Sequence, residues 1–127
     1  MKVLLDTHTL VCWFSEPEKL SKRAASIITN SSNAVLVSAA SAWELAIKVN
    51  LGKVDAISLV SDLSMHLAEE GFEELPIAIR HATRAGSLPL HHRDPFDRLL
   101  VAQALELDVP ILGADKSLDR YDIRRLW

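Results

Sequence analysis

Five acidic residues stand where short apolar runs end or where helices are expected to begin. They are Asp6, Glu44, Asp94, Asp97 and Asp115. Carboxylates that converge on one site repel one another and bind protons more tightly, and a divalent cation relieves that repulsion. Because carboxylate oxygens are hard donors, such a site favours Mg²⁺ or Mn²⁺ over Zn²⁺. A metal ion there would lower the pKa of a bound water molecule and so supply a nucleophile.

Each acid taken singly also fits a purely structural role at a helix start. Aspartate is a favoured N-cap residue, and both Asp94–Asp97 and Ser41–Glu44 resemble capping boxes. An acid in the first turn of a helix gains about 0.3–1 kcal/mol from the helix dipole. Thr7 and Ser41 can likewise orient a carboxylate or a water molecule, or cap a helix. The joint placement of the acids, rather than any one of them, therefore favours a metal site.

Short apolar runs alternate with helical patterns along the chain, which predicts a parallel sheet with helices on both faces. The expected strands are Lys2–Leu5, Ala34–Val37, Phe72–Leu75, Val109–Leu112 and Ile123–Leu126. The expected helices are one capped by Asp6 that ends near Ser15, then Leu20–Asn30, Ser41–Asn50, Leu59–Gly71, Pro76–Ala85 and Asp94–Leu107, with a loop over Leu88–Arg93. The prediction is one α/β domain over residues 1–127, a three-layer α/β/α sandwich around a mostly parallel sheet of four to five strands. Ligands of such folds bind beyond the carboxyl ends of the strands, where three of the five acids are expected.

Composition and charge exclude several other classes of protein. The chain has 127 residues and a formal net charge of −3, and its single cysteine, Cys12, allows neither an internal disulfide nor a cysteine zinc cluster. One free cysteine fits a reducing cytoplasm, where we expect the protein to reside. No apolar stretch approaches the roughly 20 residues that span a bilayer, so we expect no membrane association.

Four segments, taken in order, resemble the acidic motifs of PIN-domain ribonucleases. The similarity is closest to the VapC-type toxins of prokaryotic type II toxin–antitoxin systems, and it covers about residues 2–127. The segments are Val3–His8, Ser41–Lys48, His92–Ala104 and Gly113–Lys116. The motif around Asp97 is fairly specific, and four motifs in order at suitable spacing are more specific than any one alone. The resemblance implies a PIN-like fold and metal-dependent endoribonuclease activity, with water attacking the phosphodiester bond.

The resemblance also assigns roles to the acids and implies partners. Asp6, Glu44, Asp97 and Asp115 match the catalytic acidic quartet. Asp6 and Asp97 would be direct ligands of one or two Mg²⁺ or Mn²⁺ ions, while Glu44 and Asp115 would complete the shell. Asp94 is either a further member of that shell or a helix cap. The implied partners are an RNA substrate, a cognate antitoxin protein and a second copy of the chain.

Basic residues near the acids are candidates for contacts with RNA phosphates. Arg93 and Arg98 flank the acidic pair, and Lys48 follows Glu44 by one helical turn. Lys48 equally fits an i,i+4 ion pair with Glu44. The adjacent His91 and His92 do not suit a zinc site, because neighbouring loop side chains point apart; we expect them to face solvent or RNA.

Two other functions fit an α/β domain with acidic residues at one edge. A receiver-type phosphoacceptor domain would need an acidic pair after the first strand and an aspartate after the third, and the sequence has neither. A catalytically weak PIN-like domain that binds RNA or protein as a regulator remains the alternative, although all four acids are present.

Overall fold

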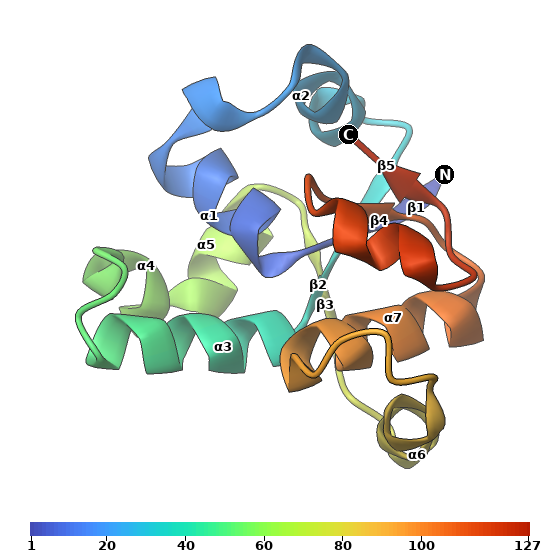
Figure 1. The fold of residues 1–127 in the computed structure, drawn as a ribbon. Helices are drawn as coiled ribbons and strands as arrows, with labels where there is room; N and C mark the ends of the chain where they lie inside the picture. The colour runs from blue at the N-terminus through green and yellow to red at the C-terminus, as the bar shows by residue number, and fades with distance from the viewer.

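A computed structural model describes residues 1–127, and a five-stranded sheet lies at its centre in the order β3-β2-β1-β4-β5 (Figure 1). Every neighbouring pair of strands is parallel. The strands are β1 (Lys2–Leu5), β2 (Ala34–Ser38), β3 (Glu73–Leu75), β4 (Ile111–Leu112) and β5 (Arg125–Leu126). The predicted α/β fold with a parallel sheet is therefore confirmed, with the last two strands shorter than expected.

Helices cover both faces of the sheet, because alternate residues of the buried strands point in opposite directions. The α-helices are α1 (Thr7–Ser15), α2 (Lys22–Thr29), α3 (Ala39–Asn50), α4 (Ile57–Ser61), α5 (Leu63–Glu69), α6 (Ile79–Ser87) and α7 (Pro95–Leu107), and two 3₁₀ helices are η1 (Pro17–Lys19) and η2 (Lys116–Arg120). Val3 and Leu5 of β1 pack in the layer of α1, α2 and α5. Leu4 packs in the opposite layer, with α7, the first turn of α3 and η2. The result is the predicted three-layer arrangement (Figure 1).

The segment expected to form one helix over Leu59–Gly71 forms two. The backbone of Asp62, with φ −137° and ψ 44°, interrupts α4 and α5. The break separates two packing tasks: Leu59 packs with Leu45 of α3, whereas Leu67 packs with the sheet core. A single straight helix would present both leucines to one surface.

Helix starts differ from the sequence expectation where a side chain or a strand end decides them. Ser38 caps α3 by accepting a hydrogen bond from Ala40 N at 3.0 Å, so this helix begins two residues earlier than expected. The predicted capping box Ser41–Glu44 is therefore wrong: Ser41 is buried inside the helix, and Glu44 lies in its second turn. Ser21 caps α2 by accepting a hydrogen bond from Ala24 N at 2.9 Å, so α2 begins at Lys22 rather than at Leu20. Helix α6 begins at Ile79 rather than at Pro76.

The helices also bear on the expectation about membranes. The longest is α7, with 13 residues. None of the helices combines the length and the apolar character that a bilayer crossing requires.

Candidate active site

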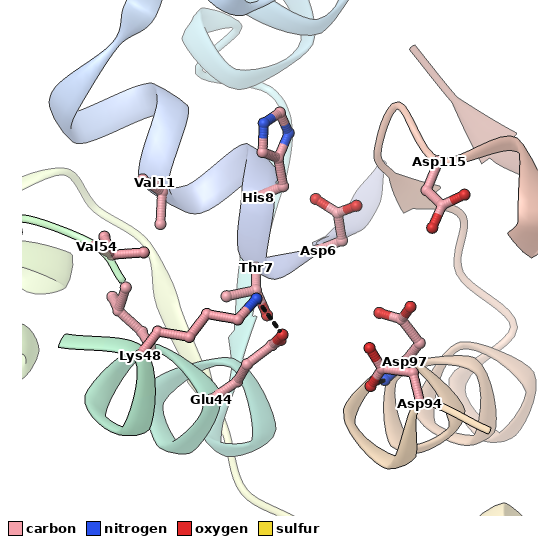
Figure 2. Close-up of a pocket in the computed structure, with 11 residues that line it drawn as sticks. Asp6, Thr7, His8, Val11, Glu44, Lys48, Val54, Asp94, Asp97 and Asp115 are labelled. Atoms are coloured by element: carbon pink, nitrogen blue, oxygen red, sulfur yellow. Dashed lines mark hydrogen bonds and ion pairs between the residues drawn. The ribbon is translucent and has the colours of Figure 1, made fainter. Parts of the chain in front are cut away.

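The five predicted acids line one cleft of about 270 Å³ beside the carboxyl ends of β1 and β4 (Figure 2). They arrive from four segments of the chain: the β1–α1 junction, α3, the start of α7 and the turn after β4. Thr7, His8 and Lys48 complete the polar lining. The convergence of all five carboxylates, which the parallel topology predicts, is present in the structure.

Asp6 is fixed at the junction of β1 and α1. Its Oδ1 caps the helix by accepting a hydrogen bond from Thr9 N at 2.8 Å, and its own N–H donates to Leu112 O at 3.1 Å. Burial raises the pKa of Asp6, although the hydrogen bond from Thr9 acts in the opposite direction. The carboxylate is therefore held in place at the expense of its hydration.

Gly113 makes room for the Asp6 carboxyl. A Cβ atom at this position would lie 2.7 Å from Asp6 Cγ, closer than non-bonded carbon atoms approach. The sequence motif Gly113–Lys116 contains this residue, but sequence reasoning gave the glycine no role. The apolar strand before it signals only that the chain turns there, because the approach of Asp6 depends on the pairing of β1 with β4.

Asp97 lies in the first turn of α7 and is affected by every other acid of the cleft. Its pKa is raised to about 7, chiefly by burial and then by the negative charges of Asp94, Glu44, Asp6 and Asp115, in that order. A carboxylate surrounded by other carboxylates in a partly dehydrated cleft holds its proton near neutral pH. The raised pKa of Asp97 indicates that the cleft has an excess of negative charge.

Only one of the two carboxylate oxygens of Glu44 has a partner within the protein. Lys48 Nζ lies 2.8 Å from Glu44 Oε2, which supports the predicted i,i+4 ion pair and raises the pKa of Lys48 (Figure 2). Glu44 Oε1 is buried and has no hydrogen-bond partner. A buried carboxylate oxygen without a partner is unfavourable unless a further donor or a cation approaches it.

Asp94 and Asp115 are exposed acids that cap the helices following them. Asp94 Oδ1 accepts hydrogen bonds from Phe96 N at 2.9 Å and Asp97 N at 3.2 Å. Asp115 Oδ1 accepts from Ser117 N at 2.9 Å, and this bond lowers the pKa of Asp115. The capping role of Asp94 is thus present, and its second oxygen remains available to the cleft.

Thr7 and Ser41 join the two helices below the cleft. Thr7 Oγ1 donates a hydrogen bond to Ser41 Oγ at 3.0 Å, and both residues are buried. Neither caps a helix, because Asp6 caps α1 and Ser38 caps α3. The pair therefore ties the helix that Asp6 caps to the helix that carries Glu44.

The donor set of the cleft fits a hard divalent cation. As the side chains stand, no three His, Cys, Asp or Glu residues are arranged closely enough to enclose a metal ion. Mg²⁺ does not need such a cage, since it keeps several water ligands and binds through one or two carboxylates. The unpartnered Glu44 Oε1 and the raised pKa of Asp97 both indicate that a cation would stabilise this cleft.

The three basic residues expected to contact RNA lie in different environments. Arg93 is exposed on the loop before α7, and Lys48 is half-buried beside Glu44. Arg98 is buried, and its guanidinium donates to the carbonyl oxygens of Ala85, Leu88 and Pro89 at 2.8–2.9 Å. A phosphate contact does not fit the surroundings of Arg98, which instead anchors the loop of residues 88–94 to α7.

His92 was not expected to reach an acid. His91 is exposed, but His92 is largely buried, and its Nε2 lies 3.6 Å from Asp97 Oδ2. Its Nδ1 lies 2.9 Å from Tyr121 Oη. The expectation that the two adjacent histidines point apart is wrong, because both rings lie against Tyr121, with ring centroids 5.0 Å away for His91 and 5.3 Å away for His92.

Comparison with known proteins gives four informative matches. The sequence profile of the PIN domain matches residues 3–124. A ribonuclease VapC22 of Mycobacterium tuberculosis (strain ATCC 25618 / H37Rv) is 32% identical over 117 residues, which cover 91% of this chain and 88% of that protein. Among solved structures, VapBC2 from Rickettsia felis bound to a DNA fragment of its promoter is similar, with a TM-score of 0.70, 16% identity and coverage of 99% and 98%. A toxin–antitoxin complex from Klebsiella pneumoniae has a TM-score of 0.63, 16% identity and coverage of 98% and 96%.

Proposed function

The chain belongs to the PIN-domain family, and we propose that it is a metal-dependent endoribonuclease that acts as the toxin of a toxin–antitoxin pair. The observation that carries the proposal is the cleft in which five carboxylates meet and in which the pKa of Asp97 rises to about 7. Structural ion-pair networks also shift pKa values, but they contain compensating cations, whereas Lys48 is the only lysine or arginine in this cleft.

We infer that the cation held here is Mg²⁺ or Mn²⁺, as one or two ions. Asp6 and Asp97 would bind it directly, and Glu44 and Asp115 would complete the shell, in part through water. A bound ion of this kind lowers the pKa of a coordinated water and stabilises negative charge on phosphoryl oxygens. The residue types support this assignment because all four are oxygen donors and none is a thiolate or an imidazole.

The residues of the chain then have distinct tasks during hydrolysis of an RNA phosphodiester bond. Asp6 holds its position through Thr9 N, so that its carboxylate does not have to be reorganised when substrate arrives. Asp97 must lose its proton to act as a ligand, and this loss couples metal binding to pH. Lys48, which lines the cleft, and Arg93, exposed on the loop before α7, would contact backbone phosphates of the RNA.

The proposed partners and location follow from the same family assignment. The M. tuberculosis relative is named a ribonuclease, and two structural neighbours are complexes of the toxin–antitoxin kind. We propose that a cognate antitoxin neutralises this chain and that the active form is a homodimer. We place it in the cytoplasm, where RNA is available and where its one buried thiol, Cys12, would stay reduced.

An RNA cleavage assay tests the proposed function. Purified protein is incubated with bacterial total RNA in Mg²⁺, in Mn²⁺ or in excess chelator, and new RNA ends are mapped by sequencing. We expect discrete ends in the presence of either metal ion, and none with chelator or in Asp6→Asn. Undiminished cleavage after chelation would contradict the metal role. Binding of RNA without cleavage under all these conditions would favour the regulatory alternative.

A further inference from the structure

Four of the five cleft carboxylates are held by a donor, and Asp97 is the exception. Backbone N–H groups hold Asp6, Asp94 and Asp115, and Lys48 holds Glu44. No hydrogen bond reaches the Asp97 carboxylate. A metal ligand that is free to rotate would have to be fixed when the ion binds, which weakens binding, so a donor beside Asp97 is to be expected.

The side chain that faces Asp97 is His92. Its Nε2 is buried, has no hydrogen-bond partner, and lies 3.6 Å from Asp97 Oδ2. This distance exceeds a hydrogen bond by a few tenths of an ångström, which a small rotation of either side chain removes. The unpaired nitrogen and the unheld carboxylate are thus neighbours.

The hydrogen-bond partners behind His92 favour one of its two neutral tautomers. Arg98 can only donate, and its NH1 group lies 3.5 Å from Tyr121 Oη. The Tyr121 oxygen accepts there, so its own hydrogen is free to point at His92 Nδ1, 2.9 Å away. A neutral imidazole that accepts at Nδ1 carries its hydrogen on Nε2, toward Asp97.

We propose that Arg98, Tyr121 and His92 form a one-way chain of hydrogen-bond donors that orients Asp97 for metal binding. The inference rests on the proposed metal-dependent function, since it concerns a metal-ligating role for Asp97. His92 is a positioning residue, because it acts on the metal only through Asp97. The chain also joins three segments, since Arg98 lies on α7, Tyr121 follows η2, and His92 lies on the loop that Arg98 anchors.

Substitutions at His92 separate donation from packing. Leucine fills part of the same space without a donor, whereas the amide nitrogen of glutamine reaches the position of Nε2. We expect His92→Leu to raise the Mn²⁺ dissociation constant, measured by calorimetry without RNA, by about 10-fold or more. His92→Gln should stay within about threefold of the wild type. The matched control is His66→Leu, which changes a histidine of α5 outside the cleft and should leave Mn²⁺ binding unchanged.

A second measurement reads the tautomer directly and does not depend on metal binding or cleavage. In ¹⁵N spectra at pH 8, where an ordinary imidazole is neutral, His92 should carry its hydrogen on Nε2 in the wild type. Tyr121→Phe should abolish that preference while leaving the ring in place, and it should weaken Mn²⁺ binding less than His92→Leu does.

The outcomes separate this inference from the proposed function. Wild-type protein that neither binds Mn²⁺ nor cleaves RNA would refute the function, while the spectra would still test the hydrogen-bond chain. If the wild type binds Mn²⁺ and His92→Leu binds it equally well, the positioning role is refuted. It is also refuted if leucine and glutamine weaken binding equally, or if His92 carries its hydrogen on Nδ1.

Discussion

Replacement of Asp97 by asparagine removes a carboxylate charge at nearly constant shape. The pKa of Asp97 rises from 3.8 to about 7 on folding, which corresponds to about 4 kcal/mol of free energy. The folded protein therefore holds a proton that the unfolded chain has lost, and its stability falls as pH rises from about 4 to about 7. Above that range Asp97 is ionised in both states, and the contribution of the bound proton is gone. About 3 kcal/mol of the loss falls between pH 5 and pH 8.

The variant lacks this pH dependence, so it should gain stability relative to the wild type as pH rises. Without metal, we expect the Tm of Asp97→Asn minus that of the wild type to increase by roughly 10 °C between pH 5 and pH 8. With saturating Mn²⁺ at pH 8 the wild type should have the higher Tm of the two proteins, because only the wild type gains the full stabilisation of a bound ligand. RNA cleavage by the variant should be lost, although its metal-free form is the more stable protein.

Thermal unfolding followed by circular dichroism measures this prediction. The control is Asp55→Asn, which changes an exposed acid outside the cleft that has no hydrogen bond or ion pair, and which should not reproduce the rise in Tm of Asp97→Asn. Equal pH dependence of the wild type and Asp97→Asn would refute the reasoning, since it would mean that Asp97 ionises normally in the folded cleft. If Mn²⁺ stabilises Asp97→Asn as much as it stabilises the wild type, Asp97 is not a metal ligand.

Substitutions at four further positions test the surroundings of the site. Gly113→Ala forces a Cβ atom to within 2.7 Å of Asp6 Cγ; we expect a loss of about 1–3 kcal/mol in urea unfolding and weaker Mn²⁺ binding by calorimetry. Asp94→Ala should lose about 1 kcal/mol of stability and Asp94→Asn almost none, because asparagine caps equally well; reduced cleavage in the asparagine variant at unchanged stability would assign the carboxylate to the metal shell. Arg98→Met should destabilise the protein by about 2 kcal/mol or more, because three carbonyl oxygens lose their donor. Arg93→Met should instead leave stability unchanged and make RNA binding, measured in the non-cleaving Asp97→Asn background, less dependent on salt by about 0.7 in logarithmic slope.

The meeting of the acids could be predicted from the sequence because parallel topology places the carboxyl ends of strands at one edge. Asp6 and Asp115 follow β1 and β4, which are paired neighbours in the sheet, so their proximity needs only the strand order. The break between α4 and α5 could not be predicted, because Leu59 and Leu67 have helical spacing and only their different packing partners separate them.

Arg93 and Arg98 show a second limit of sequence reasoning. Both flank the acidic pair in the same basic stretch, and nothing in their spacing distinguishes a surface residue from a buried anchor. The difference arises from the carbonyl oxygens at Ala85, Leu88 and Pro89, which turn inward and require donors. The role of His92 is hidden for the same reason, because its partner Tyr121 is 29 residues away in the chain.

The helix caps and the proposed metal site are two uses of the same carboxylates rather than alternatives. Asp6, Asp94 and Asp115 each place one oxygen on a backbone N–H at the start of a helix. A capping bond needs only one oxygen, so the second stays available for a cation while the first prevents the side chain from turning away. Glu44 is divided in the same way, with one oxygen on Lys48 and the other unpartnered. Helix capping, which for a single acid argues against a functional role, here supplies the rigidity that a cluster of like charges requires, and it leaves Asp97 as the carboxylate whose orientation depends on a side chain.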